Sequence, residues 1–315
     1  MSTHSSLTAR PVSDPVRLYQ YRDGLYAVDL LTAAAVEFDF FSRFAADGMS
    51  PAEVCAAFQF AQRPADVLLT LCAANGLLVS DGKLWHLTNT AREHLCEGSP
   101  WNLRPYFKSL HDRPIARDYV EVLRTGKPAG WSGDKAAGDW HKAMEEESFA
   151  RSFTAAMDCR GNYLGPALAA ALDLSEVRRV LDIGGGSGVY ACALCAVHPD
   201  LKAVVYDQAP VDRIARTLVA ERGCADRVEV IAGDMFKGLP DDCDAHLFSN
   251  VLHDWDVPEV QQLLACSRAA LPSGGLLIIH DAFINEAKDG PLHVAEYSAL
   301  LMHSTRGKCY STGEY

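Results

Sequence analysis

The spacing of apolar residues divides the chain into two parts. Over residues 25–45, apolar residues recur at helical spacing and cover most of the surface, which predicts a helix that needs a packing partner. Ser50 and Pro51 then supply an N-cap and a first helical residue, and a second helical pattern ends at Gly76. Two extended runs, LLVS and LWHLT, follow on either side of the tight-turn dipeptide Asp81-Gly82. This order of elements predicts a winged helix.

From Val177 onward, apolar strands alternate with helical segments. We expect five strands, in the segments RRVLDIGGG, AVVYD, RVEVIAGD, AHLFSNVL and GGLLIIHDAF. Helices of crossover length between them predict a parallel, doubly wound sheet, and therefore an α/β fold. The predicted domains are a winged helix over residues 1–100, a helical connector and substrate lid over 101–165, and a Rossmann-like domain over 166–315.

Composition and charge narrow the set of partners. The 315 residues carry a formal net charge of −12, so no global basic field is present to neutralise nucleic-acid phosphates. The second helix of the winged helix, over Pro64 to Asn75, contains one Asp and neither Lys nor Arg, which favours a dimerisation role over DNA binding. No apolar run approaches the ~20 residues that span a bilayer, and residues 1–16 lack a signal-peptide core. We expect a cytoplasmic protein that binds neither nucleic acid nor membrane.

The cysteines are more consistent with free thiols than with a disulfide framework. Ten are present in a chain without a secretory signal. Cys192 and Cys195 form a CxxC that would suit redox chemistry or zinc, but no second pair completes a four-ligand set. We therefore expect them to pack in the core and expect no metal site.

A glycine-rich loop follows the first predicted strand of the C-terminal domain. Asp182 is followed by Gly184, Gly186 and Gly188, a GxGxG spacing with an acid two residues before it. The dinucleotide fingerprint would require a third glycine at the position of Val189. The pattern therefore points away from NAD and toward S-adenosylmethionine (SAM).

Two further strands end in acids. Asp207 closes the second strand and Asp234 the third, so with Asp182 they would meet at the carboxyl edge of the sheet. Asp207 is placed to accept from ribose hydroxyls and Asp234 from the adenine amino group, with Met235 and Phe236 against the ring. We expect no Lys or Arg immediately beside any of these three acids. Such a crevice suits a cation such as SAM better than a pyrophosphate.

Several motifs together resemble the caffeate- and hydroxyindole-type O-methyltransferases, most closely their bacterial small-molecule branch. The segments are VLDIGGGSG, YDQAPV, GDMF, SNVLHDW and TRGKCYS. The resemblance implies a class I SAM methyltransferase domain, with Ser249 in its cofactor site, and an N-terminal winged helix that forms a homodimer. It also implies methyl transfer to a hydroxyl of a small aromatic molecule in secondary metabolism.

The same resemblance makes His253, in HDW, the general base. A neutral imidazole suits this role, because a phenol must lose its proton as it attacks the methyl carbon. Two family glutamates that flank the base correspond to Asp281, which keeps a carboxylate, and to Cys309, which is acidic only if its thiol ionises. Asp254, beside the base, suits a capping role at least as well as an orienting one.

The family's substrate pocket corresponds to Met157, Met302 and His303, and we add Phe153, one helical turn before Met157. These residues predict a flat apolar slot with one or two polar groups. Relatives in this family continue past the GKxxS segment with a helix and two strands, whereas the sequence ends at Tyr315. We therefore expect the sheet to lack those strands and to expose the edge after the fifth strand, whether the chain is a fragment or a short form.

Other functions fit the same motifs. One is a C- or N-methyltransferase, or an enzyme that uses bound SAM without methylating. Another, from a non-enzyme class, is a winged-helix regulator that senses SAM, which the net acidic charge disfavours.

Overall fold

The computed structural model describes residues 7–9, 11–129 and 140–315, so residues 130–139 of the predicted connector lie outside the described part. The chain divides into two compact units. The first comprises Met1–Asp14, His141–Leu252 and Val257–Asp281. The second comprises Pro15–Trp140, His253–Asp256 and Ala282–Tyr315.

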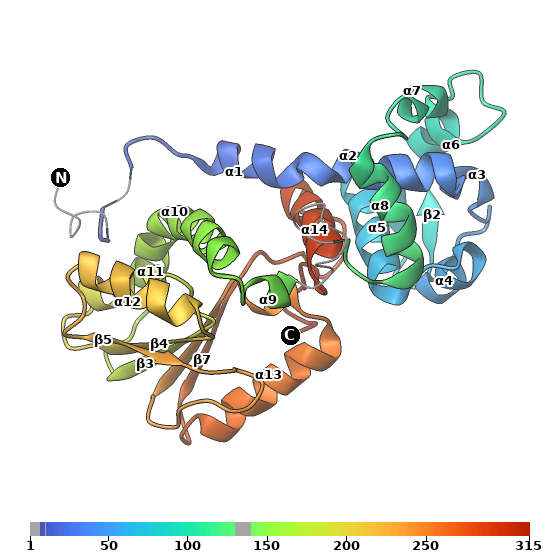
Figure 1. The fold of residues 1–315 in the computed structure, drawn as a ribbon. Coiled ribbons are helices and arrows are strands. Elements are labelled where there is room, and N and C mark those ends of the chain that lie inside the picture. Colours follow the sequence, from blue (N-terminus) through green and yellow to red (C-terminus); the bar gives the residue numbers. More distant parts are fainter. Residues whose placement is uncertain (1–6, 10, 130–139) are drawn as a thin grey trace. The chain divides into compact units, whose positions relative to one another are not determined.

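A parallel sheet forms the centre of the first unit (Figure 1). Its order is β5-β4-β3-β6-β7, with the bounds β3 (Arg179–Ile183), β4 (Lys202–Asp207), β5 (Val228–Ala232), β6 (Ala245–Ser249) and β7 (Leu276–His280). These are the five predicted strands, and their parallel pairing confirms the doubly wound α/β fold. The direction in which strands are added reverses between β3 and β6, which is where such sheets bind ligands.

Helices cover both faces of this sheet. Figure 1 shows α10 (Glu147–Ala171), α11 (Val189–Val197) and α12 (Val211–Glu221) on one face and α13 (Val257–Ala270) on the other. α10 packs closely on α11, since a Cβ at Gly161 would lie 2.2 Å from Val189 Cγ1. Cys192 and Cys195 on α11 are fully buried in the core, as predicted.

One edge of the sheet is β7, as expected. Its residues Leu276 and Leu277 are 40% and 39% exposed. The short helix α9 (Trp140–Ala143) precedes α10 in the chain.

The second unit contains the predicted winged helix. Its elements, in chain order, are α4 (Pro51–Phe58), α5 (Gln62–Ala74), β1 (Leu78–Ser80), β2 (Trp85–Leu87) and α6 (Asn89–Leu95). β1 and β2 pair antiparallel, and the Asp81 carboxylate accepts from the N–H groups of Lys83 and Leu84 in the turn. The Ser50 side chain caps α4, and the Glu53 side chain accepts from the Ser50 N–H, which completes a capping box.

The expectation of one helix over residues 25–45 was wrong. After α1 (Val16–Asp23), the segment forms a 3₁₀ turn (Gly24–Tyr26), α2 (Ala27–Thr32), a π-helical turn (Ala33–Glu37) and α3 (Phe40–Arg43). Asp39 adopts a φ of 50°, a left-handed conformation that breaks the helix before α3. The breaks allow Phe40, Phe41 and Phe44 to turn into the core.

The C-terminal segment of the chain packs with the N-terminal helices. The remaining helices of this unit are α7 (Arg104–Lys108), α8 (Pro114–Thr125) and α14 (Leu292–Ser304). α14 contacts α5 and α8, and the Tyr119 hydroxyl donates to the Ala299 carbonyl at 2.8 Å. Residues 282–315 therefore share a core with the winged helix rather than with the sheet. Within the described residues, no helix has the length and apolar character needed to cross a membrane.

Candidate active site

The glycine loop connects β3 to α11. Gly184, Gly186 and Gly188 have φ values of 66°, 55° and 72°, a region that favours glycine. A Cβ at Gly186 would meet nothing within 4 Å, whereas one at Gly185 would lie 2.8 Å from the Asp182 carboxyl carbon. The loop thus folds over Asp182 and leaves open space beside Gly186.

Asp182 is buried and Asp207 half-buried at the ends of the neighbouring strands β3 and β4. Gly186 N–H donates to Asp207 Oδ2 at 2.9 Å, and Gln208 N–H donates to Oδ1 at 2.8 Å. Burial raises the pKa of Asp207 to about 6, against the lowering effect of these two bonds. Burial and the Asp207 charge raise the pKa of Asp182 to about 7, against the lowering effect of the Ala191 backbone N–H. Within the described residues neither acid has a cationic partner, and two such neighbouring acids favour a positively charged ligand.

Asp234, Met235 and Phe236 follow β5 and are half-buried. The Asp234 carboxylate caps its own turn, accepting from Phe236 N–H at 2.9 Å. It also contacts the ammonium of Lys237 at 3.1 Å, so our interpretation that no Lys or Arg stands beside the acids was wrong for Asp234. The turn places Lys237, three residues later, next to the Asp234 carboxylate, although the Lys237 side chain is largely exposed to solvent.

Ser249, at the end of β6, belongs to a polar network that the sequence did not indicate. Its hydroxyl bonds His280 Nδ1 at 2.8 Å, across the paired ends of β6 and β7. The Asn250 amide donates to Ser249 Oγ at 3.3 Å and to the Tyr190 hydroxyl at 3.1 Å. Tyr190, Asn250 and His280 therefore line the same sheet edge as Ser249. In the sequence, only the position of each of these residues at the end of a helix or strand could have pointed to this network.

The first unit fits SAM. The positive-φ glycines permit close approach of a ligand to the backbone, and the buried Asp182 carboxylate suits a cation. Asp207 keeps spare acceptor capacity, because each carboxylate oxygen offers two lone-pair sites and accepts only one described bond.

His253 lies on a 3₁₀ turn, Leu252–Asp254, directly after β6. It is 3% exposed, its ring packs edge-on against Tyr297 with centroids 5.6 Å apart, and its Nε2 lies 3.8 Å from Asp254 Oδ1. Gly307 lies against the backbone of this turn, since a Cβ there would lie 1.9 Å from the His253 carbonyl oxygen. The imidazole is therefore held on a closely packed turn of the second unit.

The other predicted site residues fall in both units. Asp281 follows β7 in the first unit, and Phe153 and Met157 lie half-buried on α10, with Phe153 stacked on Phe149. In the second unit, Met302 is fully buried in the core and Cys309 is buried after α14. His303 is also buried, and its Nε2 lies 3.2 Å from Asp118 Oδ2. Burial lowers the pKa of His303, although Asp118 opposes this effect.

Comparison with known proteins identifies the family. A model of the O-methyltransferase domain matches residues 118–315. The chain is 33% identical over 305 residues to 3-hydroxy-5-methyl-1-naphthoate 3-O-methyltransferase of Streptomyces sahachiroi, covering 96% of this chain and 87% of that protein. It is 38% identical over 164 residues to aclacinomycin 10-hydroxylase of Streptomyces purpurascens, covering 52% of this chain and 44% of that protein.

A solved structure agrees with this assignment. The crystal structure of an O-methyltransferase family 2 protein from Planctomyces limnophilus, in complex with apigenin, superposes with a TM-score of 0.86 and 30% identity, covering 98% of this chain and 90% of that one. Because the domain model matches more than half of the sequence and the naphthoate enzyme matches nearly all of it, the chain belongs to the O-methyltransferase family, a family of SAM-dependent enzymes.

Proposed function

We propose that this enzyme methylates a hydroxyl group of a small aromatic molecule, with His253 as the general base. The observation that carries the proposal is the pair of neighbouring acids, buried Asp182 and half-buried Asp207, beside an open glycine loop in a chain of this family. The proposed donor, SAM, supplies an electrophilic methyl group when bound. Family membership supports hydroxyl oxygen as the acceptor atom.

The proposed cofactor contacts follow from the ends of the strands. Asp207 would accept from the ribose hydroxyls, and its bond from Gly186 N–H fixes the carboxylate beside the glycine loop. Asp234 would accept from the adenine amino group, with Met235 and Phe236 against the ring. The Phe236 carbonyl accepts from the Gln262 amide on α13 at 3.1 Å, which restricts this segment. Ser249 would contact the cofactor at the end of β6.

His253 would accept the acceptor's hydroxyl proton. A free phenol has a pKa near 10, so at neutral pH a neutral imidazole within hydrogen-bond reach assists the attack by about 10²- to 10⁴-fold. Edge-on packing against Tyr297 restricts rotation of the ring. By the family resemblance, Asp281 and Cys309 would occupy the positions of the two family glutamates, and of the two only Asp281 keeps a carboxylate.

The acceptor class is suggested by the relatives. One is named for a hydroxylated naphthoate and another was crystallised with apigenin, and both compounds are flat, hydroxylated aromatics. Phe153 and Met157, half-buried on α10, are the proposed contacts in the first unit, whereas Met302 and His303 are enclosed within the second. We therefore propose a fused-ring phenol as the acceptor.

We also propose a homodimer formed through the N-terminal helices. Leu18, Tyr21 and Leu25, on α1 and the turn after it, are 73%, 84% and 58% exposed. Large apolar side chains exposed on consecutive turns favour a protein interface. The winged helix is proposed to serve this assembly and not DNA, and failure to retard DNA even at low salt would support that assignment.

The test of activity is transfer of a labelled methyl group from SAM to a panel of hydroxynaphthoates and flavones. A base-stable ether product would support the proposal. Label on a ring carbon or nitrogen, or a hydroxylated product without label, would contradict it. The last outcome would match the reaction named for the aclacinomycin relative.

A further inference from the structure

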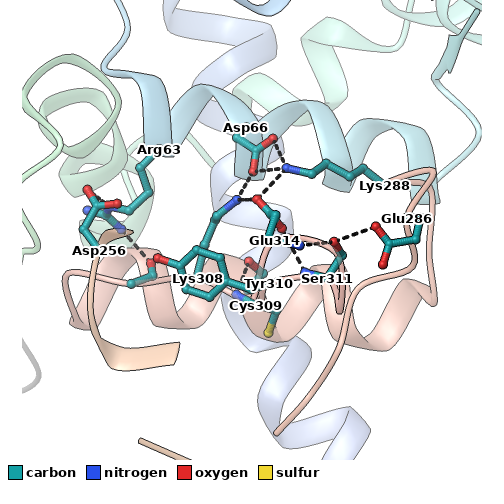
Figure 2. A network of polar contacts seen from close by, with 12 residues as sticks. Arg63, Asp66, Asp256, Glu286, Lys288, Lys308, Cys309, Tyr310, Ser311 and Glu314 are labelled. Atoms are coloured by element: carbon teal, nitrogen blue, oxygen red, sulfur yellow. Dashed lines mark hydrogen bonds and ion pairs between the residues drawn. The ribbon is translucent and has the colours of Figure 1, made fainter. Parts of the chain in front are cut away.

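Arg63 is a buried arginine of α5 whose partners lie far away in the sequence. Its side chain is 5% exposed. Nη1 donates to the Gly307 carbonyl at 2.8 Å and Nη2 to the Gly126 carbonyl at 2.5 Å, while Nε lies 3.9 Å from Asp256 Oδ2 (Figure 2). A single guanidinium therefore links the winged helix to residues 307 and 256.

Asp66, one helical turn further along α5, binds the same C-terminal segment through an ion cluster. Figure 2 shows Asp66, Lys288, Lys308 and Glu314 converging on one point. Lys288 Nζ lies 2.8 Å from Asp66 and 2.9 Å from Glu314, and Lys308 Nζ contacts both carboxylates. Burial acts to raise the pKa of Asp66, but Lys308 and Lys288 lower it below its ordinary value. Two positive and two negative charges thus balance, with the Lys308 side chain 7% exposed.

The segment held by these groups contacts the turn that carries His253. Arg306 N–H donates to the Asp254 carbonyl at 3.1 Å, and the Tyr310 hydroxyl donates to the Trp255 carbonyl at 2.7 Å. Between them, Gly307 packs directly on the His253 carbonyl, where even a methyl group could not fit. Residues 306–310 therefore contact the backbone of His253, Asp254 and Trp255.

We infer that Arg63 and Asp66 are positioning residues for the His253 turn, acting through residues 306–310. This inference rests on the proposed role of His253. Each side chain fixes backbone that supports the imidazole. The guanidinium suits this role, because its planar, forked group can donate to two carbonyl oxygens at once. A lysine ammonium could reach only one of them at a time.

A matched control exists in the same unit. Arg43 also bridges two backbone carbonyls, those of Phe38 at 3.1 Å and Ala57 at 2.9 Å, but both belong to the N-terminal helices. Arg43→Met therefore reports the effect of losing such a bridge on stability alone. Arg63→Lys tests the fork geometry, and the pair Asp66→Asn and Asp66→Glu tests the ion cluster.

The experiment combines kinetics with NMR of the full-length protein carrying ¹³C-labelled histidine. The His253 signal is identified by its loss in His253→Gln. In Arg63→Met we expect this signal to move and kcat to fall about 10- to 100-fold, the penalty typical of small misplacement. The Kd for S-adenosylhomocysteine should stay near the wild-type value. Arg63→Lys and Asp66→Asn should show smaller changes, Asp66→Glu should recover the wild-type signal, and Arg43→Met should change only the melting temperature.

An unchanged His253 signal in folded Arg63→Met and Arg63→Lys would overturn the inference, whatever happens to kcat. Failure of the proposed function would appear differently. In that case His253→Gln would keep the wild-type kcat, while movement of the His253 signal in Arg63→Met would still support the positioning role. If Arg63→Met does not fold, Arg63→Lys and Asp66→Asn decide the question by the same signal.

Discussion

The peptide N–H of Gly186 donates a 2.9 Å hydrogen bond to the carboxylate of Asp207. This bond ties the glycine loop after β3 to the end of the neighbouring strand β4. The same carboxylate therefore shapes the loop and faces the proposed ribose position. Loss of its charge should affect cofactor binding both directly and through the loop.

Replacing Asp207 with Ala should weaken S-adenosylhomocysteine binding while leaving the chain folded. Hydrogen bonds to a charged group contribute about 1.5 to 3 kcal/mol, so the Kd should rise about 10- to 100-fold. Calorimetric titration measures this directly, and Asp200→Ala, in the exposed turn before β4, is the control. A wild-type Kd in Asp207→Ala would remove Asp207 from the cofactor site.

Replacing Asp182 with Asn should stabilise the ligand-free protein at pH 8. Burial, together with the Asp207 charge, raises the pKa of Asp182 to about 7, whereas an unfolded Asp titrates near 4. Between these pH values the folded state holds a proton that the unfolded state has released, so stability falls as pH rises through this window. Above pH 7 the penalty is complete, at about 1.4 kcal/mol for each unit of pKa shift.

The measurement is the melting temperature of Asp182→Asn and wild type at pH 4.5 and pH 8, without ligand. The melting temperature of the variant minus that of the wild type should be larger at pH 8 than at pH 4.5. Taking this difference at each pH cancels the effect of the other titrating groups. Equal differences at both pH values would mean that Asp182 does not titrate in this window. The same variant should bind S-adenosylhomocysteine more weakly at pH 8, since the attractive charge is lost.

Features set by a few adjacent residues were predictable from the sequence. The Ser50 capping box, the Asp81 turn, the five strands and the glycine loop each depend on neighbours in the chain. The break at Asp39 was not predicted, because the apolar pattern continues across it and the left-handed φ of 50° leaves no mark in that pattern.

Contacts between distant residues were beyond the reach of pattern reasoning. Arg63 and Gly307 are 244 positions apart. The predicted helix, Pro64 to Asn75, left Arg63 out, and its polarity suggested only that it would bind DNA poorly, whereas α5 begins at Gln62 and includes Arg63. Likewise, Ser249 was selected by resemblance, while its bond to His280 depends on the pairing of β6 with β7. Such partners are fixed by topology, which local periodicity does not encode.

Placing charges on α1 should dissociate the proposed dimer. Leu18 and Tyr21 are strongly exposed, so Leu18→Asp with Tyr21→Asp should leave the fold intact and yield monomers at micromolar concentration. Sedimentation velocity distinguishes the two states. Val79→Asp on β1, at a residue 54% exposed, should remain dimeric. A wild-type monomer at this concentration would contradict the assembly itself.

Replacing His253 with Ala should lower turnover and leave cofactor affinity near wild type. Loss of a general base typically reduces the rate by about 10²- to 10⁴-fold. The loss should be largest for phenols of ordinary pKa near 10 and smaller for acidic nitrophenols, which ionise without help. For the same reason, residual activity of the variant should rise with pH as the acceptor itself ionises.

The dependence of the rate on the acidity of the phenol and on pH distinguishes a general base from a residue that only packs. His293→Ala, on the exposed face of α14, is the control and should keep wild-type kinetics. If His253 only filled space beside Tyr297, its replacement would lower the rate by the same factor for every phenol, and raising the pH would restore nothing. An effect confined to the Kd of S-adenosylhomocysteine would instead indicate that His253 binds the cofactor and does not accept the proton.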